Sequence, residues 1–224
     1  MIKAKAFGRL YKADEMDKKY LLRPDMARAT AINQRFWYLG VALDQGAEPA
    51  CVGYSTWKWL YGGPVKNRAL PFSPFQLYKE AQKWDEWPGD LYDGTSVRGA
   101  FKFLQNQGYV GSYNWAFDVN AVANYVLTVG PIVMGTDWLT GMMEPDQNMY
   151  IKATGIVEGG HAYLFCGLNR RRKNPDSSVG AFRILNSWGP YWGAKGRAWI
   201  TFNDVANLLA RADAEACAAV ERAK

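Results

Sequence analysis

The sequence predicts an α+β protein, with a helical first half and a second half rich in β-strands. Apolar residues recur at helical spacing from Cys51 to about Trp115, whereas the chain after Gly130-Pro131 carries short apolar runs separated by Gly, Asn and Pro turns. Its 224 residues, 49% of them apolar, suffice for one or two hydrophobic cores. We therefore expect a single unit spanning residues 1–224.

Three helices are expected in the first half, at about residues 51–61, 74–81 and 97–104. The first is stopped by Gly62-Gly63-Pro64. Ser73, followed by proline, is an N-cap residue for the second. Either Thr95 or Ser96 caps the third, and Gly108 ends it.

The second half opens with one more helix and then changes to strands. Asp118 caps a helix over residues 119–129, which Gly130-Pro131 ends. The apolar runs that follow predict strands at about residues 132–134, 162–168, 181–185 and 198–202.

The chain is predicted to end in helices. Asn203-Asp204 caps one that continues through Leu208 and Leu209. The alanine-rich tail, residues 212–223, is amphipathic, so residues 206–224 are expected to form a C-terminal helical region. This region either packs on the fold or docks a partner or a second copy.

The net charge is +6, and the densest basic run is residues 170–173. A turn-rich stretch, residues 174–178, follows it between two apolar segments, which indicates a solvated hairpin loop. The alternative is attraction to acidic peptides, nucleic acid or an anionic surface. Nucleic acid is not expected, because no aromatic residues are interleaved with the charges.

The sequence gives no sign of a membrane, a metal or an organic cofactor. No stretch reaches the roughly 20 apolar residues of a membrane span, and the first residues lack a hydrophobic segment and a cleavage site. Three cysteines (Cys51, Cys166 and Cys217) and one histidine are too few for a disulfide framework or a metal site. We expect a reducing, cytoplasmic location, with Cys166 and Cys217 in the core.

The candidate catalytic side chains are a thiol, an imidazole and two amides. His161 is the only histidine, and it stands in Gly159-Gly160-His161-Ala162 ahead of an apolar run. Asn186-Ser187-Trp188-Gly189 follows 25 residues later, and Gln45 precedes Cys51 by six residues. Acyl transfer to a thiol needs a nucleophile, a base, an orienter of that base and an amide donor.

Cys51 is predicted at the start of a helix, where the helix dipole and an imidazolium lower a thiol pKa. We therefore expect a resting ion pair of Cys51 thiolate and His161 imidazolium. The negative charge that forms on an attacked carbonyl oxygen needs donors worth about 3 kcal/mol each. Gln45 and the Cys51 backbone N–H are the candidates.

These motifs together resemble the papain family of cysteine peptidases, over roughly residues 41–205. The resemblance implies a papain-like two-lobed fold: an N-terminal segment (1–43), a helical lobe (about 44–115), a β-rich lobe (about 116–205), and a cleft between Cys51 and His161. It implies that Cys51 is the nucleophile, His161 the general base and acid, Asn186 the orienter of the imidazole, and Gln45 the oxyanion-hole side chain. Trp188 would cover the bond between Asn186 and His161.

The resemblance also places a substrate in the cleft. Asp93-Gly94-Thr95-Ser96 looks like the family segment that pairs with the substrate backbone, although Thr95 stands in place of its second glycine. The other implied substrate contacts are Gly160 and the walls of the pocket for the residue two before the cleaved bond: Ser96, Val97, Gly135 and Gly159. The two pocket glycines favour a bulky apolar or aromatic side chain.

The sequence departs from the family in two ways that bear on its state. Glu48 and Tyr92 occupy the places of a family disulfide, which therefore cannot form. The segment before Gln45 is far shorter than the family's inhibitory propeptide, so we expect the chain to be active without trimming.

The predicted activity is that of a cysteine endopeptidase, which hydrolyses a polypeptide substrate through a thioester on Cys51. Two alternatives remain open. One is a deconjugating isopeptidase or peptide ligase that uses the same residues. The other is a non-catalytic papain-fold protein that binds a partner through the cleft. The sequence does not indicate an oligomeric state.

Overall fold

The computed structural model describes residues 5–23 and 26–219. It contains a seven-stranded sheet in the order β2-β7-β3-β4-β5-β6, with β1 pairing with β4. All of these strand pairs are antiparallel. The strands are β1 (Gln34–Phe36), β2 (Asn114–Ala116), β3 (Ile132–Leu139), β4 (Val157–Lys173), β5 (Val179–Leu185), β6 (Arg197–Thr201) and β7 (Glu215–Ala218).

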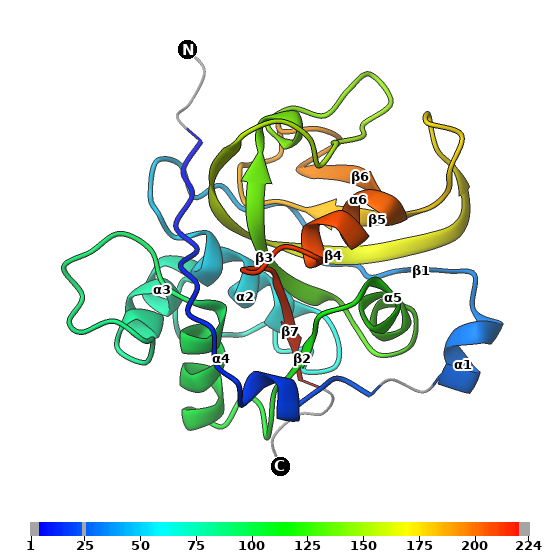
Figure 1. Cartoon of the computed structure of the whole chain (residues 1–224). Helices are drawn as coiled ribbons and strands as arrows, with labels where there is room; N and C mark the ends of the chain where they lie inside the picture. Colours follow the sequence, from blue (N-terminus) through cyan, green and yellow to red (C-terminus); the bar gives the residue numbers. More distant parts are fainter. Residues whose placement is uncertain (1–4, 24–25, 220–224) are drawn as a thin grey trace.

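Helices flank this sheet, and the predicted α+β class is confirmed. They are α1 (Met26–Ala31), α2 (Cys51–Tyr61), α3 (Pro74–Gln82), α4 (Val97–Asn106), α5 (Val119–Thr128) and α6 (Phe202–Leu209), with short 3₁₀ turns η1 (Asp17–Lys19) and η2 (Thr140–Met142). In Figure 1, α2, α3 and α4 gather on one side and β4, β5 and β6 on the other. No helix in the described ranges is long and apolar enough to cross a membrane.

The helices of the first lobe begin where their cap residues predict. Ser73 forms a capping box with Gln76 at the start of α3, and the Ser96 side chain accepts the Gly99 N–H at the start of α4. The predicted helix over residues 51–61 is confirmed as α2. Its first residue therefore lies at a defined point, where the helical lobe meets the sheet.

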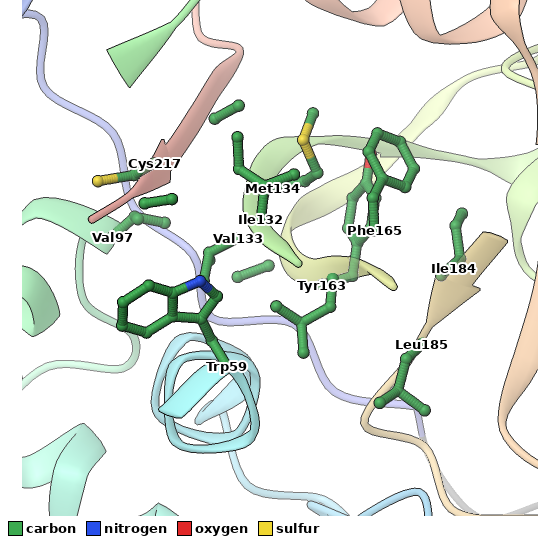
Figure 2. Packing of buried hydrophobic residues seen from close by; sticks show 14 of the residues in the cluster. Trp59, Val97, Ile132, Val133, Met134, Tyr163, Phe165, Ile184, Leu185 and Cys217 are labelled. Atoms are coloured by element: carbon green, nitrogen blue, oxygen red, sulfur yellow. The ribbon is translucent and has the colours of Figure 1, made fainter. Parts of the chain in front are cut away.

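The core joins the two lobes through α2. Trp59 is fully buried, and its indole Nε1 donates to the Pro131 carbonyl at 2.8 Å. Figure 2 shows this indole extending from α2 toward Val133 on β3, with Val97 of α4 nearby. Burial of a large aromatic side chain contributes roughly 2–3 kcal/mol. This packing holds the C-terminal part of α2 against the sheet.

The N-terminal segment is part of the fold. In Figure 1 it descends between the helical lobe and β3. The Leu10 N–H donates to the Thr95 carbonyl at 2.9 Å, and the Leu22 N–H donates to the Trp115 carbonyl at 2.7 Å. Asp17 forms a buried ion pair with the Arg98 guanidinium. The segment is therefore anchored at several points along its length.

The prediction of helix for residues 212–223 is wrong in its described part. Residues 215–218 form β7, which lies between β2 and β3, and Cys217 is fully buried there. Alanine favours a helix in isolation, but here the small side chains fit between the sheet and the helices. The backbone groups of β3 also need partners at that edge. Residues 220–224 lie outside the described part.

The basic run is only partly a loop. Residues 170–173 continue β4, and the turn that joins it to β5 occupies residues 174–178. The Arg172 guanidinium lies 4.0 Å from the centroid of Trp199, and Arg170 donates to Asn124 at 2.6 Å. These contacts explain why the charges lie on a strand.

Candidate active site

The thiol lies at the start of α2. Cys51 is its first residue, and Ala50, the N-cap residue, makes no side-chain capping bond, so the positive end of the helix faces the site. The Cys51 Sγ accepts the backbone N–H of Ala162 at 3.4 Å. Because Ala162 follows His161 on β4, this bond brings the thiol beside the imidazole. All three cysteines are buried free thiols.

The hydrogen bond between His161 and Asn186 sets the tautomer of the imidazole. The Asn186 Oδ1 lies 2.8 Å from the His161 Nε2 and also accepts the backbone N–H of Ser187 at 2.8 Å. Since an amide oxygen carries no hydrogen and can only accept, the Nε2 carries the proton. The His161 Nδ1 is buried and has no hydrogen-bond partner among the described residues. Its lone pair is therefore available to take a proton from a thiol.

Aromatic rings enclose this imidazole. Trp188 and Trp138 both lie 4.8 Å from the ring of His161, centroid to centroid. Tyr163 stacks behind it at 6.2 Å. The position of Trp188 fits its predicted role as a cover for the Asn186 bond. Trp138 was not identified from the sequence, because the strand predicted at 132–134 stopped before it.

Gln45 is held in place by the motif around Asn186. The Ser187 hydroxyl donates to the Gln45 Oε1 at 2.6 Å, and the Gln45 backbone N–H donates to the Ser187 carbonyl at 2.8 Å. The Gln45 Nε2 donates to the Glu48 carbonyl at 2.7 Å and to the Ala6 carbonyl at 3.3 Å. The amide therefore already binds a carbonyl oxygen in the cleft. Ser187 is a positioning residue that the sequence did not reveal.

Residues 6–10 lie along the cleft between the two predicted substrate-binding walls. Thr95 pairs with the segment in parallel on one side: its N–H donates to the Gly8 carbonyl at 2.9 Å. On the other side, the Gly160 carbonyl accepts the N–H of Arg9 at 3.0 Å. The Thr95 hydroxyl turns away to Asp85, at 2.6 Å. Thr95, which stands in place of the family's second glycine, therefore still pairs through its backbone with a chain in the cleft.

The segment also covers Cys51 and His161. The Phe7 ring meets His161 edge-on at 5.8 Å and Trp188 at 5.8 Å. The Trp188 Nε1 donates to the Ala6 carbonyl at 3.1 Å. Cys51 and His161 have no exposed surface in this arrangement. The sequence predicts a chain that is active without trimming, but its short segment fills the cleft, because an extended chain of five residues suffices to span it.

Burial also determines the protonation of the pair. It raises the pKa of Cys51 to about 12 and lowers the pKa of His161 to about 4. A thiol is neutral below its pKa, and an imidazole is neutral above its own. Both groups are therefore neutral near pH 7 while the segment is in place. The predicted resting ion pair of Cys51 and His161 is therefore wrong for this arrangement, because burial disfavours both charges.

The residues predicted to line the substrate pocket fall into two groups. Ser96 caps α4 and Val97 is fully buried, so neither presents an exposed side chain. Gly135 and Gly159 lie against the segment: a Cβ on Gly135 would stand 2.7 Å from the Arg9 Nε, and one on Gly159 would stand 2.9 Å from the Phe7 ring. Gly135 and Gly159 therefore border the space that the segment fills.

No family model matches the chain. It is 31% identical to "Cathepsin B-like CP3" of Giardia intestinalis over 160 residues, which are 70% of this chain and 48% of that protein. It is 24% identical to "Cathepsin B-like cysteine proteinase 6" of Caenorhabditis elegans over 137 residues, 58% of this chain and 35% of that protein. The chain thus spans about half or less of the length of these curated relatives.

The solved structures cover more of the fold. Xylellain, a cysteine protease from Xylella fastidiosa, matches with a TM-score of 0.74 at 17% identity over 98% of both chains. The procathepsin B S9 of Trypanosoma congolense matches with a TM-score of 0.70 at 13% identity, over 98% of this chain and 87% of that one. The architecture is therefore the papain fold, with a cysteine and a histidine facing its cleft. Its sequence is similar to those of cathepsin B-like cysteine proteinases, and its fold is that of the papain-like cysteine peptidases.

Proposed function

We propose that this protein is a cysteine endopeptidase, with Cys51 as nucleophile and His161 as general base and acid. The observation that carries the proposal is the tautomer of His161: Asn186 holds the Nε2, the Nδ1 has no hydrogen-bond partner among the described residues, and the thiol accepts the N–H of the next residue, Ala162. A buried core histidine would use both nitrogens in hydrogen bonds. One unpaired nitrogen next to a thiol at a helix start supports a catalytic pair.

The proposed reaction passes through a thioester. The His161 Nδ1 takes the thiol proton, the Cys51 sulfur attacks the carbonyl carbon of the peptide bond, and Gln45 and the Cys51 N–H stabilise the resulting oxyanion. His161 gives its proton to the leaving amine, the C–N bond breaks, and the acyl group remains on sulfur. A water that His161 deprotonates then adds to the thioester, the C–S bond breaks, and the thiol returns with release of a carboxylic acid.

Labelling of Cys51 tests this proposal once the segment can leave the cleft. Ala13 and Asp14 are exposed, whereas Asp17 and Arg98 pair beyond them, so a protease recognition sequence inserted between residues 13 and 14 allows a cut after folding. We call this protein the cut chain. An epoxide peptide should modify its Cys51 stoichiometrically near pH 6 and leave Cys166 and Cys217 unmodified, by mass spectrometry.

Equal modification of all three cysteines, or none at Cys51, would contradict the proposal and favour a non-catalytic binding protein. Cys51→Ala is the matched control and should abolish labelling. Product analysis on a peptide and on an isopeptide of the same sequence separates endopeptidase from deconjugating or ligase activity.

Gln45→Ala in the cut chain is expected to lower kcat by roughly 10- to 1,000-fold, because the amide acts on charge that exists only in the transition state. Peptide hydrolysis measures this loss. Alkylation of Cys51 by iodoacetamide forms no oxyanion, so its rate should stay within about threefold of that of the unsubstituted cut chain. Parallel loss of both rates would mean that Gln45 serves only to shape the site.

A further inference from the structure

A groove of about 1310 Å³ lies outside the cleft, between one wall from residues 36–42 and another from residues 190–195. It is larger than the roughly 300–1,000 Å³ pockets that hold small molecules. Tyr38, Val41 and Tyr191 line it and are 76%, 71% and 99% exposed. Exposed apolar surface gathered in one place is typical of an interaction site. The groove therefore suits a segment of polypeptide better than a small ligand.

Both walls of the groove continue into the candidate active site. One wall leads to Gln45 and the other to Trp188, within three residues in each case. Between the groove and the site, the Gly189 N–H donates to the Leu43 carbonyl at 2.9 Å, which joins the two walls. No described residue of the N-terminal segment lines the groove. A polypeptide could therefore bind there beside the cleft, whether or not the segment is in place.

The charged residues that line the groove are all cations: Arg183, Lys195 and Arg197. Among the described residues, none of the three forms an ion pair. The Arg197 guanidinium donates to the Gly40 carbonyl at 2.7 Å on one wall and to the Lys195 carbonyl at 2.9 Å on the other. These bonds hold the guanidinium between the walls, but a carbonyl group does not neutralise its charge.

The cations around the groove also disfavour one another. The Arg183 guanidinium lies 5.0 Å from the centroid of Trp199, and its pKa is lowered by burial and by the charges of Arg197 and Arg172. Lys58 of α2 is buried nearby, and its pKa is lowered to about 8, first by burial and then by Arg197. Carboxylates placed in the groove would relieve this repulsion between like charges.

We propose that this groove binds an acidic stretch of polypeptide with an aromatic or aliphatic anchor, and that it docks substrates outside the cleft. Carboxylates of the stretch pair with Arg183, Lys195 and Arg197. The anchor packs against Tyr38 and Tyr191. Binding follows from the groove itself, whereas the role in docking substrates rests on the proposed peptidase function.

The lining favours a polypeptide over a membrane or a nucleic acid. Arg183 and Arg197 are only partly exposed, so a side-chain carboxylate can reach them, whereas a flat layer of lipid headgroups would meet the fully exposed Tyr191 first. Three cations neutralise few phosphates of a nucleic acid. Val41 and Pro190 add aliphatic surface, which suits an apolar side chain.

The first arm of the test measures binding and needs no catalysis. A labelled peptide in which glutamates flank phenylalanine is titrated with the whole chain carrying Cys51→Ala, and fluorescence anisotropy gives its Kd. It should bind at least about 10-fold more tightly than the same peptide with glutamine for each glutamate. The double variant Arg183→Gln/Lys195→Gln should lose most of this difference. The matched control Arg171→Gln/Lys173→Gln, which removes two exposed charges of β4 outside the groove, should retain it.

The anchor has its own variant. Tyr191→Ala should weaken the glutamate and glutamine peptides alike, by about 3- to 10-fold, because it removes apolar contact and no charge. The side chain is 99% exposed, so its loss should leave the fold unchanged.

The second arm is kinetic and uses the cut chain. A fluorogenic peptide is joined through a flexible Gly-Ser linker to the glutamate stretch or to its glutamine counterpart, first at one end and then at the other. The glutamate stretch should raise kcat/KM at least about 10-fold from one of the two ends, because the tether raises its effective concentration at the cleft. Arg183→Gln/Lys195→Gln should abolish the gain, and Arg171→Gln/Lys173→Gln should keep it.

The outcomes separate the two proposals. Equal affinity for the glutamate and glutamine peptides overturns the groove as a binding site, even if the cut chain hydrolyses the unextended peptide. Tighter binding of phosphatidylserine vesicles or of a single-stranded oligonucleotide overturns the choice of occupant. Binding without a kinetic gain from either end overturns the docking role. Selective binding with no hydrolysis or labelling by any cut chain supports the groove and contradicts the peptidase proposal. If Arg183→Gln prevents folding, Lys195→Gln at its exposed position provides the same comparison.

Discussion

Cutting the chain between residues 13 and 14 is expected to raise peptide hydrolysis by about 100- to 1,000-fold. In the uncut chain, the Phe7 ring covers His161, and the Ala6 carbonyl accepts a hydrogen bond from the Gln45 amide. Neither Cys51 nor His161 is exposed. A tethered segment acts at an effective concentration in the millimolar range, so micromolar intrinsic affinity holds the cleft closed about 99.9% of the time. Release of the fragment removes that occupancy. A fluorogenic peptide assay before and after the cut measures the change.

The same protein before cutting is the matched control, and the unmodified chain treated with the protease controls for the protease itself. The pKa values add a second measurement. With the segment in place, the neutral Cys51 should resist alkylation near pH 7, because its pKa lies at about 12. After the cut, water enters, and alkylation should accelerate together with hydrolysis. An uncut chain that hydrolyses peptides as fast as the cut one would show that the segment leaves the cleft spontaneously.

Much of the fold could be predicted because its signals are local. Ser73, Ser96 and Asp118 cap the helices that they were expected to cap. A cap is recognised from the few residues that follow it. The candidate site was also visible in the sequence, because Cys51, His161 and Asn186 each stand in a distinctive short motif. The structure brings these three together from α2, β4 and the residues after β5.

What could not be predicted depends on pairing between distant residues. Glu215 lies in an alanine-rich tail whose composition predicts a helix. It reaches Arg9 only because these residues form β7, which lies between β2 and β3. The Arg9 side chain donates to Glu215, which lies 206 residues away in the sequence. Trp138 reaches His161 only through the register of β3 on β4. None of these contacts leaves a periodic or motif signal.

His161→Ala in the cut chain is expected to lower kcat by about 10,000-fold or more, comparable to the loss of a base in other nucleophile–base pairs. The sequence has no second histidine that could replace it. The His161 Nδ1 is expected to accept the thiol proton and later to give it to the leaving amine, while the Nε2–H stays bonded to the Asn186 Oδ1. Without it, the leaving amine receives no proton, and the thiol has no imidazolium to stabilise its charge. Hydrolysis of the same fluorogenic peptide measures the loss of kcat.

The pH dependence of alkylation separates this role from a structural one. In the cut chain, the ion pair should keep Cys51 reactive near pH 6. In His161→Ala, reactivity should rise only near the ordinary thiol pKa of about 8.5. Asn186→Ala is the matched comparison: it keeps the imidazole but removes its orienting bond, so kcat should fall less while Cys51 stays reactive near pH 6. If His161→Ala keeps the reactivity of the cut chain at pH 6, the thiolate is stabilised by the α2 terminus alone, and the imidazole has no part in activating Cys51.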